Sequence, residues 1–303
     1  MQLALIGYGE VGRILAEDLR ARGVVTAAFD VQLAAAASPT SDAMRRHARQ
    51  HRVMLADSHV AAVHGADLVI SAVTASQAVA VAQACAPGLA RGSFFLDLNS
   101  ASPGAKIRAA ESVNATAARY VEGAVMTALP PHRIQVPLLL GGPDAAALQP
   151  ILGDLGFAAR VASERLGVAS ATKMCRSVMI KGLEAMVIES FTTARHYGVE
   201  EALIASLHET FPGIDWDGQG TYFFQRVIEH GRRRAEEVRE VAVTVSEAGL
   251  QPWSAAGTAE RQAWMADLAD AGLFGARGGV AFARSSDWRI EADRILAQLK
   301  KDN

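Results

Sequence analysis

Residues 3–30, LALIGYGEVGRILAEDLRARGVVTAAFD, decide how the first part of this chain folds. The stretch opens with an unbroken apolar run at 3–6, which is typical of a strand buried on both faces of a parallel sheet. A G-x-G-x-x-G motif follows at once, and then apolar residues recur at helical intervals. A second apolar run, 24–29, ends on Asp30. The stretch therefore predicts a strand, a tight turn, a helix and a second strand.

The three glycines of the motif have separate roles in binding a dinucleotide. Gly7 permits the tight turn, Gly9 lets a pyrophosphate approach the backbone, and Gly12 lets the helix pack close to the strand. Free N–H groups at the start of the helix bind the anion. The alternative interpretation is a glycine-rich turn in another kind of α/β protein.

Asp30 follows the motif at the distance typical of a ribose-binding acid. Its carboxylate can accept hydrogen bonds from ribose hydroxyls and would repel a 2′-phosphate, so the sequence favours NAD over NADP. We expect the following residues to contact the cofactor NAD: Gly7, Tyr8, Gly9, Glu10, Val11, Gly12 and Asp30.

Composition limits the class of protein. The chain has 303 residues, of which 50% are hydrophobic and 20% charged, with a net charge of −2. These values are typical of a soluble protein of up to two domains, and they indicate neither a nucleic-acid nor a membrane partner. The motif begins essentially at Met1, so we expect no signal or transit peptide. Cys85 and Cys175 are far apart, which fits the reducing cytoplasm and argues against structural zinc; we predict no metal site.

Strand-like and helix-like segments alternate as far as residue 162. The expected strands are 67–73, 93–98, 120–125, 136–140 and 158–161, and the expected helices are 42–51, 76–85 and 145–152. Residues 32–41 are expected to form a loop that ends in a helix cap at Ser41. This alternation predicts a Rossmann-type α/β domain with a doubly wound, mostly parallel sheet over residues 1–162.

Ligands of such sheets bind at the carboxyl ends of the strands. Val73, Thr74, Asn99 and Ser100 follow predicted strands, and we expect them to line the nicotinamide side of the site. The alternative is that these polar residues only cap the helices that follow. The loop 126–137, which contains Thr127, His132 and Arg133, is expected to project from a sheet edge and to carry binding groups.

From residue 163 to 303 helical periodicity replaces the strands, which predicts an all-helical second domain. Residues 167–196 form one long, mostly apolar helix, on which Lys173, Arg176, Ser177 and Glu184 share one stripe. Such a stripe must face either a wet cleft or a network of ion pairs. The charged run from Arg232 to Glu237 is expected to form a salt-bridged helix surface.

Lys173 is the candidate general acid/base. Desolvation and the nearby Arg176 are expected to lower the pKa of this lysine, so that it could take a proton from a hydroxyl as hydride leaves the carbon. The guanidinium of Arg176, beside the lysine, has the right shape to bind the carboxylate of a substrate. The alternative is that both cations pair with acids across the domain interface.

Three stretches carry a resemblance to a known family: GYGEVG at 7–12, DLNSASP at 97–103 and GVASATK at 167–173. In them the chain resembles the β-hydroxyacid dehydrogenase and 6-phosphogluconate dehydrogenase superfamily. The resemblance spans nearly the whole chain, but it is weak in the last 100 residues. It implies that Lys173 is the general acid/base and that the protein is a homodimer.

The chain also departs from the pattern of that superfamily. Met126 stands about where the family serine belongs, and Thr127 is the nearest hydroxyl. Arg176 and Ser177 replace the usual asparagine, and Glu236-Glu237 replaces a Lys-Asp pair. These departures argue against 6-phosphogluconate as the substrate, and they indicate a divergent branch with its own C-terminal helical domain.

The sequence thus predicts an NAD-dependent dehydrogenase that oxidises a small hydroxy acid or reduces the corresponding carbonyl acid. Its predicted catalytic residues are Lys173, Arg176 and Thr127, and its expected partners are a small carboxylate substrate and a second copy of the chain. A non-catalytic NAD sensor or scaffold, an oxidoisomerase and an imine reductase are the alternatives. The aromatic cluster at 216–224 is expected in the core or a dimer interface, or in a pocket wall.

Overall fold

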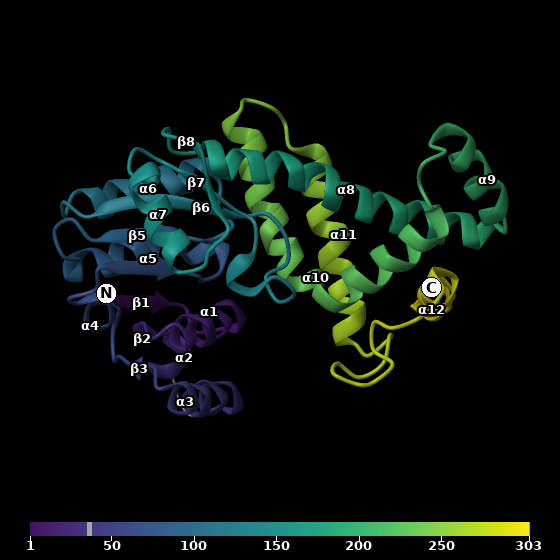
Figure 1. The fold of residues 1–303 in the computed structure, drawn as a ribbon. Coiled ribbons are helices and arrows are strands. Elements are labelled where there is room, and N and C mark those ends of the chain that lie inside the picture. The colour runs from purple at the N-terminus through teal and green to yellow at the C-terminus, as the bar shows by residue number, and fades with distance from the viewer. Residues whose placement is uncertain (35–37, 303) are drawn as a thin grey trace. The chain divides into compact units, whose positions relative to one another are not determined.

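The structure is a computed structural model that describes residues 1–34 and 38–302. The chain divides into two compact units, Met1–Met174 and Cys175–Asn303 (Figure 1). The division falls within one long helix, α8 (Val168–Tyr197). The predicted domain boundary after residue 162 lies beside the end of the last strand and stays a prediction.

The first unit is built on a single sheet, which has eight strands within the described residues. Its strands are β1 (Gln2–Ile6), β2 (Val25–Phe29), β3 (Met54–Leu55), β4 (Leu68–Ser71), β5 (Phe94–Asp97), β6 (Arg119–Val125), β7 (Leu138–Gly141) and β8 (Ala159–Ser163). Their order across the sheet is β3-β2-β1-β4-β5-β6-β7-β8. Every neighbouring pair is parallel except β6 and β7. The predicted Rossmann-type, mostly parallel sheet is confirmed.

Helices cover both faces of this sheet. They are α1 (Glu10–Ala21), α2 (Val31–Ala34), α3 (Pro39–His51), α4 (His59–Val63), α5 (Ala78–Cys85), α6 (Pro103–Asn114) and α7 (Ala145–Asp154). Alternate residues of β1 belong to two different cores, as the period of a strand requires. Leu5 packs with residues of α1, α3 and α7, whereas Ile6 packs with residues of α4, α5 and α6. The unit therefore has three layers, and the crossover from β3 to β4 places the ends of β1 and β4 side by side at the topological switch point.

The loop predicted at 32–41 is wrong in part. Residues 31–34 form the short helix α2, and α3 begins at Pro39 rather than at Asp42. Ser38 is its N-cap, and Ser38 and Ser41 form a reciprocal capping box, so Ser41 lies inside the first turn. Proline at the first helical position and the S-x-x-S spacing favour this earlier start. Residues 35–37 lie outside the described residues.

All regular secondary structure among the described residues of the second unit is helical, as predicted. It contains most of α8 together with α9 (Glu200–Thr210), α10 (Trp216–Glu247), α11 (Trp253–Asp270) and α12 (Trp288–Asp302). Trp216, Phe223 and Phe224 of the predicted aromatic cluster are buried in its core, whereas Tyr222 is exposed. Among residues 1–34 and 38–302, none of the helices combines the length and the apolar character needed to cross a bilayer.

Ion pairs inside this unit change the prediction for the charged run at 232–237. Arg232 and Arg233 do pair on the surface, but Arg234 is buried and bonds Glu184 of α8. Glu237 pairs at 2.7 Å with the buried Lys181, whose pKa is lowered because burial disfavours the charged form. The prediction of a salt-bridged helix surface is therefore wrong for Arg234, whose ion pair is buried, since helical spacing alone does not show which face a neighbouring helix covers.

Candidate functional site

The glycine-rich turn joins β1 to α1 and has the geometry that a dinucleotide requires. Gly7 has a φ of +93°, and a Cβ atom there would collide with the carbonyl oxygen of Ala72. A Cβ atom at Gly12 would collide with the carbonyl oxygen of Gly7. At Gly9, by contrast, a Cβ atom would meet nothing within 4 Å. The first and third glycines are thus required by packing, while the second faces open space.

The start of α1 suits a bound pyrophosphate. Gly9 is the N-cap of this helix, and it provides no side-chain hydrogen bond to the first amides. Those N–H groups and the helix dipole favour an anion at this end. Glu10 is exposed and Val11 half-buried in the first turn. The residues therefore fit an NAD-type cofactor at the predicted place.

Asp30 does more than the sequence predicts. It directly follows β2, and one carboxylate oxygen accepts a hydrogen bond from the backbone N–H of Tyr8 at 2.8 Å. The other oxygen accepts the N–H of Gln32 at 2.9 Å. Each carboxylate oxygen can accept a further bond, so Asp30 fixes the glycine-rich turn and retains acceptor capacity for a ribose.

Asn99 connects the ends of β4 and β5. Its side-chain oxygen accepts the N–H of Val73 at 2.6 Å, and its side-chain nitrogen donates to Ser71 at 3.0 Å. Only 4% of Asn99 is exposed, whereas Thr74 is exposed and its side chain does not cap the turn that follows. Asn99 is thus a fixed link between two strand ends, which local sequence could not show.

A buried charge cluster supports the exit of β5. The ammonium of Lys106 lies 2.8 Å from one carboxylate oxygen of Asp97, and the Tyr120 hydroxyl donates to the other at 2.7 Å. Burial and the neighbouring Asp97 charge raise the pKa of Tyr120 well above its usual value. All three side chains are almost fully buried, so they hold residues 97–100 in a fixed position.

Lys173 reaches this same exit. Its ammonium donates a hydrogen bond to the hydroxyl of Ser100 at 2.5 Å, and both residues are half-buried. Two residues singled out independently in the sequence are therefore in contact. The contact lies within the first unit, at the carboxyl ends of the strands, where α/β sheets bind ligands.

Glu122 positions the start of the helix that carries Lys173. It lies on β6 and is fully buried, and its two oxygens accept the Ala169 N–H at 3.1 Å and the Ser170 hydroxyl at 2.7 Å. A carboxylate at a helix N-terminus also stabilises the helix dipole. Sequence reasoning missed this residue, although an acid within the apolar strand 119–125 is itself a signal.

The other predicted catalytic residues are less constrained. Met126, in the place of the family serine, packs beside Ala169 at the start of α8. Thr127 follows it and is exposed, and Arg176 is exposed one turn beyond Lys173 on α8. Their catalytic roles stay predictions.

The prediction that the loop 126–137 projects from a sheet edge is wrong. It connects β6 to β7, which are both interior strands of the sheet. Arg133 folds back onto α1 and pairs with Glu17 at 2.7 Å and Asp18 at 2.8 Å. Opposite charges across this contact hold the loop against the helix, so Arg133 is a structural residue in this arrangement, while His132 is exposed.

Comparison with known proteins supports a dinucleotide-binding domain in the first unit. Residues 2–160 match the family described as the NAD binding domain of 6-phosphogluconate dehydrogenase. The chain belongs to this family. Residues 194–265 match a domain of unknown function, DUF1932, so this member carries a second, different region after its NAD-binding domain. The predicted divergent branch with its own helical C-terminal domain is thereby confirmed.

Three solved structures show how this family member relates to others. A conserved hypothetical protein from Sinorhizobium meliloti 1021 is 33% identical, covers 98% of this chain and 96% of its own, and gives a TM-score of 0.76. A conserved protein of unknown function, described as similar to 3-hydroxyacid dehydrogenases, is 26% identical with coverages of 89% and 99% and a TM-score of 0.68. Mycobacterium tuberculosis 3-hydroxyisobutyrate dehydrogenase with L-serine shares the fold at 16% identity, coverages of 88% and 94% and a TM-score of 0.69.

Proposed function

We propose that the protein is an NAD-dependent dehydrogenase that oxidises a small hydroxy acid, or reduces the corresponding carbonyl acid, with Lys173 as general acid/base. The contact between the Lys173 ammonium and Ser100 carries this proposal. It brings a proton-transferring amine to the strand ends at which a dinucleotide-binding sheet receives its ligands. The relative described as similar to 3-hydroxyacid dehydrogenases supports the same substrate class.

The residues divide the work in the following way. The turn 7–12 holds the pyrophosphate and Asp30 holds the ribose, while NAD, when bound, supplies the hydride acceptor. As the alcohol is oxidised, neutral Lys173 takes the hydroxyl proton; in the reverse direction its ammonium returns that proton to the carbonyl oxygen. Ser100 accepts a hydrogen bond from the ammonium and so fixes its direction.

Arg176 and Thr127 complete the proposed substrate site. A guanidinium binds a carboxylate with two parallel hydrogen bonds, and a hydroxyl can replace the family serine as a donor. Both side chains are exposed, as substrate contacts must be before binding. This assignment explains how a chain without the family serine and asparagine could still orient a hydroxy acid.

NAD rather than NADP is the proposed cofactor, because the Asp30 carboxylate would repel a 2′-phosphate. A homodimer located in the cytoplasm is part of the same proposal. Two apolar side chains of α8 are exposed, Met179 to 71% and Met186 to 62%, and they support a contact with the second subunit of this homodimer. The free thiols Cys85 and Cys175 fit a reducing compartment.

The test is a screen of small hydroxy acids for NAD reduction, with wild type and Lys173→Met compared side by side. Lys300→Met, on an exposed lysine of α12, is the matched control. We expect turnover with wild type and the control, and a loss of about 10²- to 10⁴-fold in Lys173→Met with NAD binding retained. Binding of NAD without turnover of any hydroxy acid would favour the sensor, and turnover confined to imines would favour the imine reductase.

A further inference from the structure

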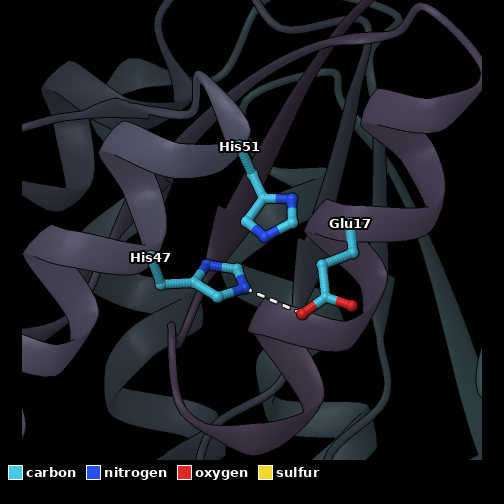
Figure 2. A group of neighbouring side chains, drawn as sticks. All are labelled: Glu17, His47 and His51. Atoms are coloured by element: carbon cyan, nitrogen blue, oxygen red, sulfur yellow. Dashed lines mark hydrogen bonds and ion pairs between the residues drawn. The ribbon is translucent and has the colours of Figure 1, made fainter.

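Two histidines and a carboxylate meet between α1 and α3, apart from the proposed substrate site. Figure 2 shows Glu17 on α1 facing His47 and His51 on α3. One nitrogen of His47 lies 2.9 Å from a carboxylate oxygen of Glu17, and the two imidazole rings stack with centroids 4.4 Å apart. We propose that these three residues bind a divalent transition-metal ion of the zinc class.

The spacing of the donor atoms suits such an ion. His47 and His51 are four residues apart on α3, so both rings project from the same face of the helix. One potential ligand atom from each of the three residues lies within 4.8 Å of the other two. A tetrahedral zinc ion with bonds of about 2.0–2.1 Å needs its ligand atoms about 3.3 Å apart. Binding therefore requires side-chain rotations that bring these atoms closer together.

The surroundings of the cluster supply the outer contacts that metal-binding histidines require. The second nitrogen of His47 lies 2.8 Å from the hydroxyl of Tyr8. An imidazole that binds a metal through one nitrogen is oriented by a hydrogen bond at the other. Tyr8 therefore fixes the ring of His47.

The charges around the cluster also admit a cation. The second oxygen of Glu17 is paired with Arg133 at 2.7 Å, which leaves the oxygen near His47 as the ligand. Arg133 is balanced in turn by Asp18 at 2.8 Å.

The donor set selects the class of metal. Two imidazoles and one carboxylate suit zinc and similar divalent transition-metal ions, whereas magnesium and calcium prefer ligand sets made of oxygen atoms alone. Three protein ligands leave one position of a tetrahedral ion for water. Because the side chain of Glu17 is 32% exposed and that of His47 14%, the ion can enter from solvent. The hydrogen bond between His47 and Tyr8 joins the site to the glycine-rich turn, so a bound ion would restrict the motion of this turn.

The experiment uses the full chain, stripped of metal with a chelator and titrated with zinc chloride by calorimetry. Cobalt(II) serves as a second probe, because its visible bands report a tetrahedral site. Wild type is compared with His51→Ala and with His64→Ala, which removes an exposed histidine elsewhere in the same unit. We expect one equivalent of zinc in wild type and His64→Ala. Loss of a residue that only hydrogen-bonds a metal ligand lowers metal affinity by about 10- to 100-fold. In His51→Ala, which loses a ligand itself, we expect the zinc affinity to fall by more than this.

Glu17→Gln provides an independent reading if His51→Ala does not fold, and it should also lose tetrahedral cobalt bands. Zinc binding in His51→Ala or Glu17→Gln as tight as in His64→Ala would overturn the proposal. Competition by magnesium at concentrations similar to those of zinc would overturn the assignment to the zinc class. None of these measurements depends on the proposed dehydrogenase activity.

Discussion

Alanine at Gly9 should weaken cofactor binding while leaving the fold intact. Gly9 has a φ of −72°, so alanine there avoids the left-handed region that makes such a substitution costly at Gly7. A Cβ atom there meets nothing within 4 Å. Loss of glycine at the N-cap costs up to about 1 kcal/mol, and the reduced entropy of the unfolded chain offsets about 0.4–1 kcal/mol of it. The free energy of unfolding should therefore change by less than about 1 kcal/mol.

The same methyl group should have a large effect on binding, because it occupies the space through which a pyrophosphate approaches the backbone. Overpacking of this kind costs about 1–3 kcal/mol. Since about 1.4 kcal/mol corresponds to a tenfold change in affinity, the Kd for NAD should rise by about 5- to 150-fold.

Gly7→Ala is the matched comparison. Its φ of +93° costs an alanine about 1–2 kcal/mol. The collision with the Ala72 carbonyl adds about 1–3 kcal/mol, so unfolding should become easier by about 2–5 kcal/mol. Calorimetric titration with NAD and urea unfolding measure the two effects. Wild-type affinity in Gly9→Ala, or equal destabilisation of both variants, would refute the geometry of the turn.

Three further changes test other parts of the first unit. Asp30→Asn should raise the affinity for NADP relative to NAD by about tenfold in paired titrations, because it removes the charge that repels a 2′-phosphate. If the ratio of the two affinities did not change, Asp30 would not set the cofactor preference. Glu122→Gln should lower the free energy of unfolding in urea by about 1–3 kcal/mol, because the new amide faces a buried donor at Ala169 or Ser170. The control Glu164→Gln, at an exposed position, should change it by less than about 0.5 kcal/mol. Burial raises the pKa of the Cys85 thiol from 9.0 to about 12, so its contribution to stability is complete below pH 9.0 and is lost as the pH rises towards 12. The free energy of unfolding of wild type should therefore fall over this pH range, and Cys85→Ala should lose this part of the fall. An unchanged pH dependence in Cys85→Ala would contradict the prediction.

The sequence predicted the sheet and the turn because their signals are local. Apolar runs of strand length, a glycine motif and the acid at position 30 are all read within a few residues of one another. Lys173 was also found locally, as a cation on an apolar helix. Ser100 was found in the same way, at the end of a predicted strand, but its contact with Lys173 joins residues 73 positions apart and was not predicted.

The remaining features depend on partners distant in sequence. Glu122 fixes α8, which lies 47 residues away, and Arg133 pairs with an α1 residue 115 positions earlier. Arg234 appeared to belong to a surface run because nothing local shows that its face meets Glu184. The prediction of no metal site rested on the cysteines and stays a prediction; the approach of Glu17 to His47, 30 residues away, is likewise not visible in local spacing. Buried polar pairs are properties of packing, which periodicity alone does not specify.

Chemical rescue tests the central claim, that Lys173 transfers the proton at the mouth of the dinucleotide site, most directly. Lys173→Ala should bind NAD normally and lose about 10²- to 10⁴-fold in turnover of the hydroxy acid that wild type oxidises. Added primary amines should then restore the rate, and more basic amines should restore it more, as Brønsted behaviour requires. Turnover near the wild-type rate without amine, or no recovery with any amine while NAD stays bound, would contradict this role for Lys173.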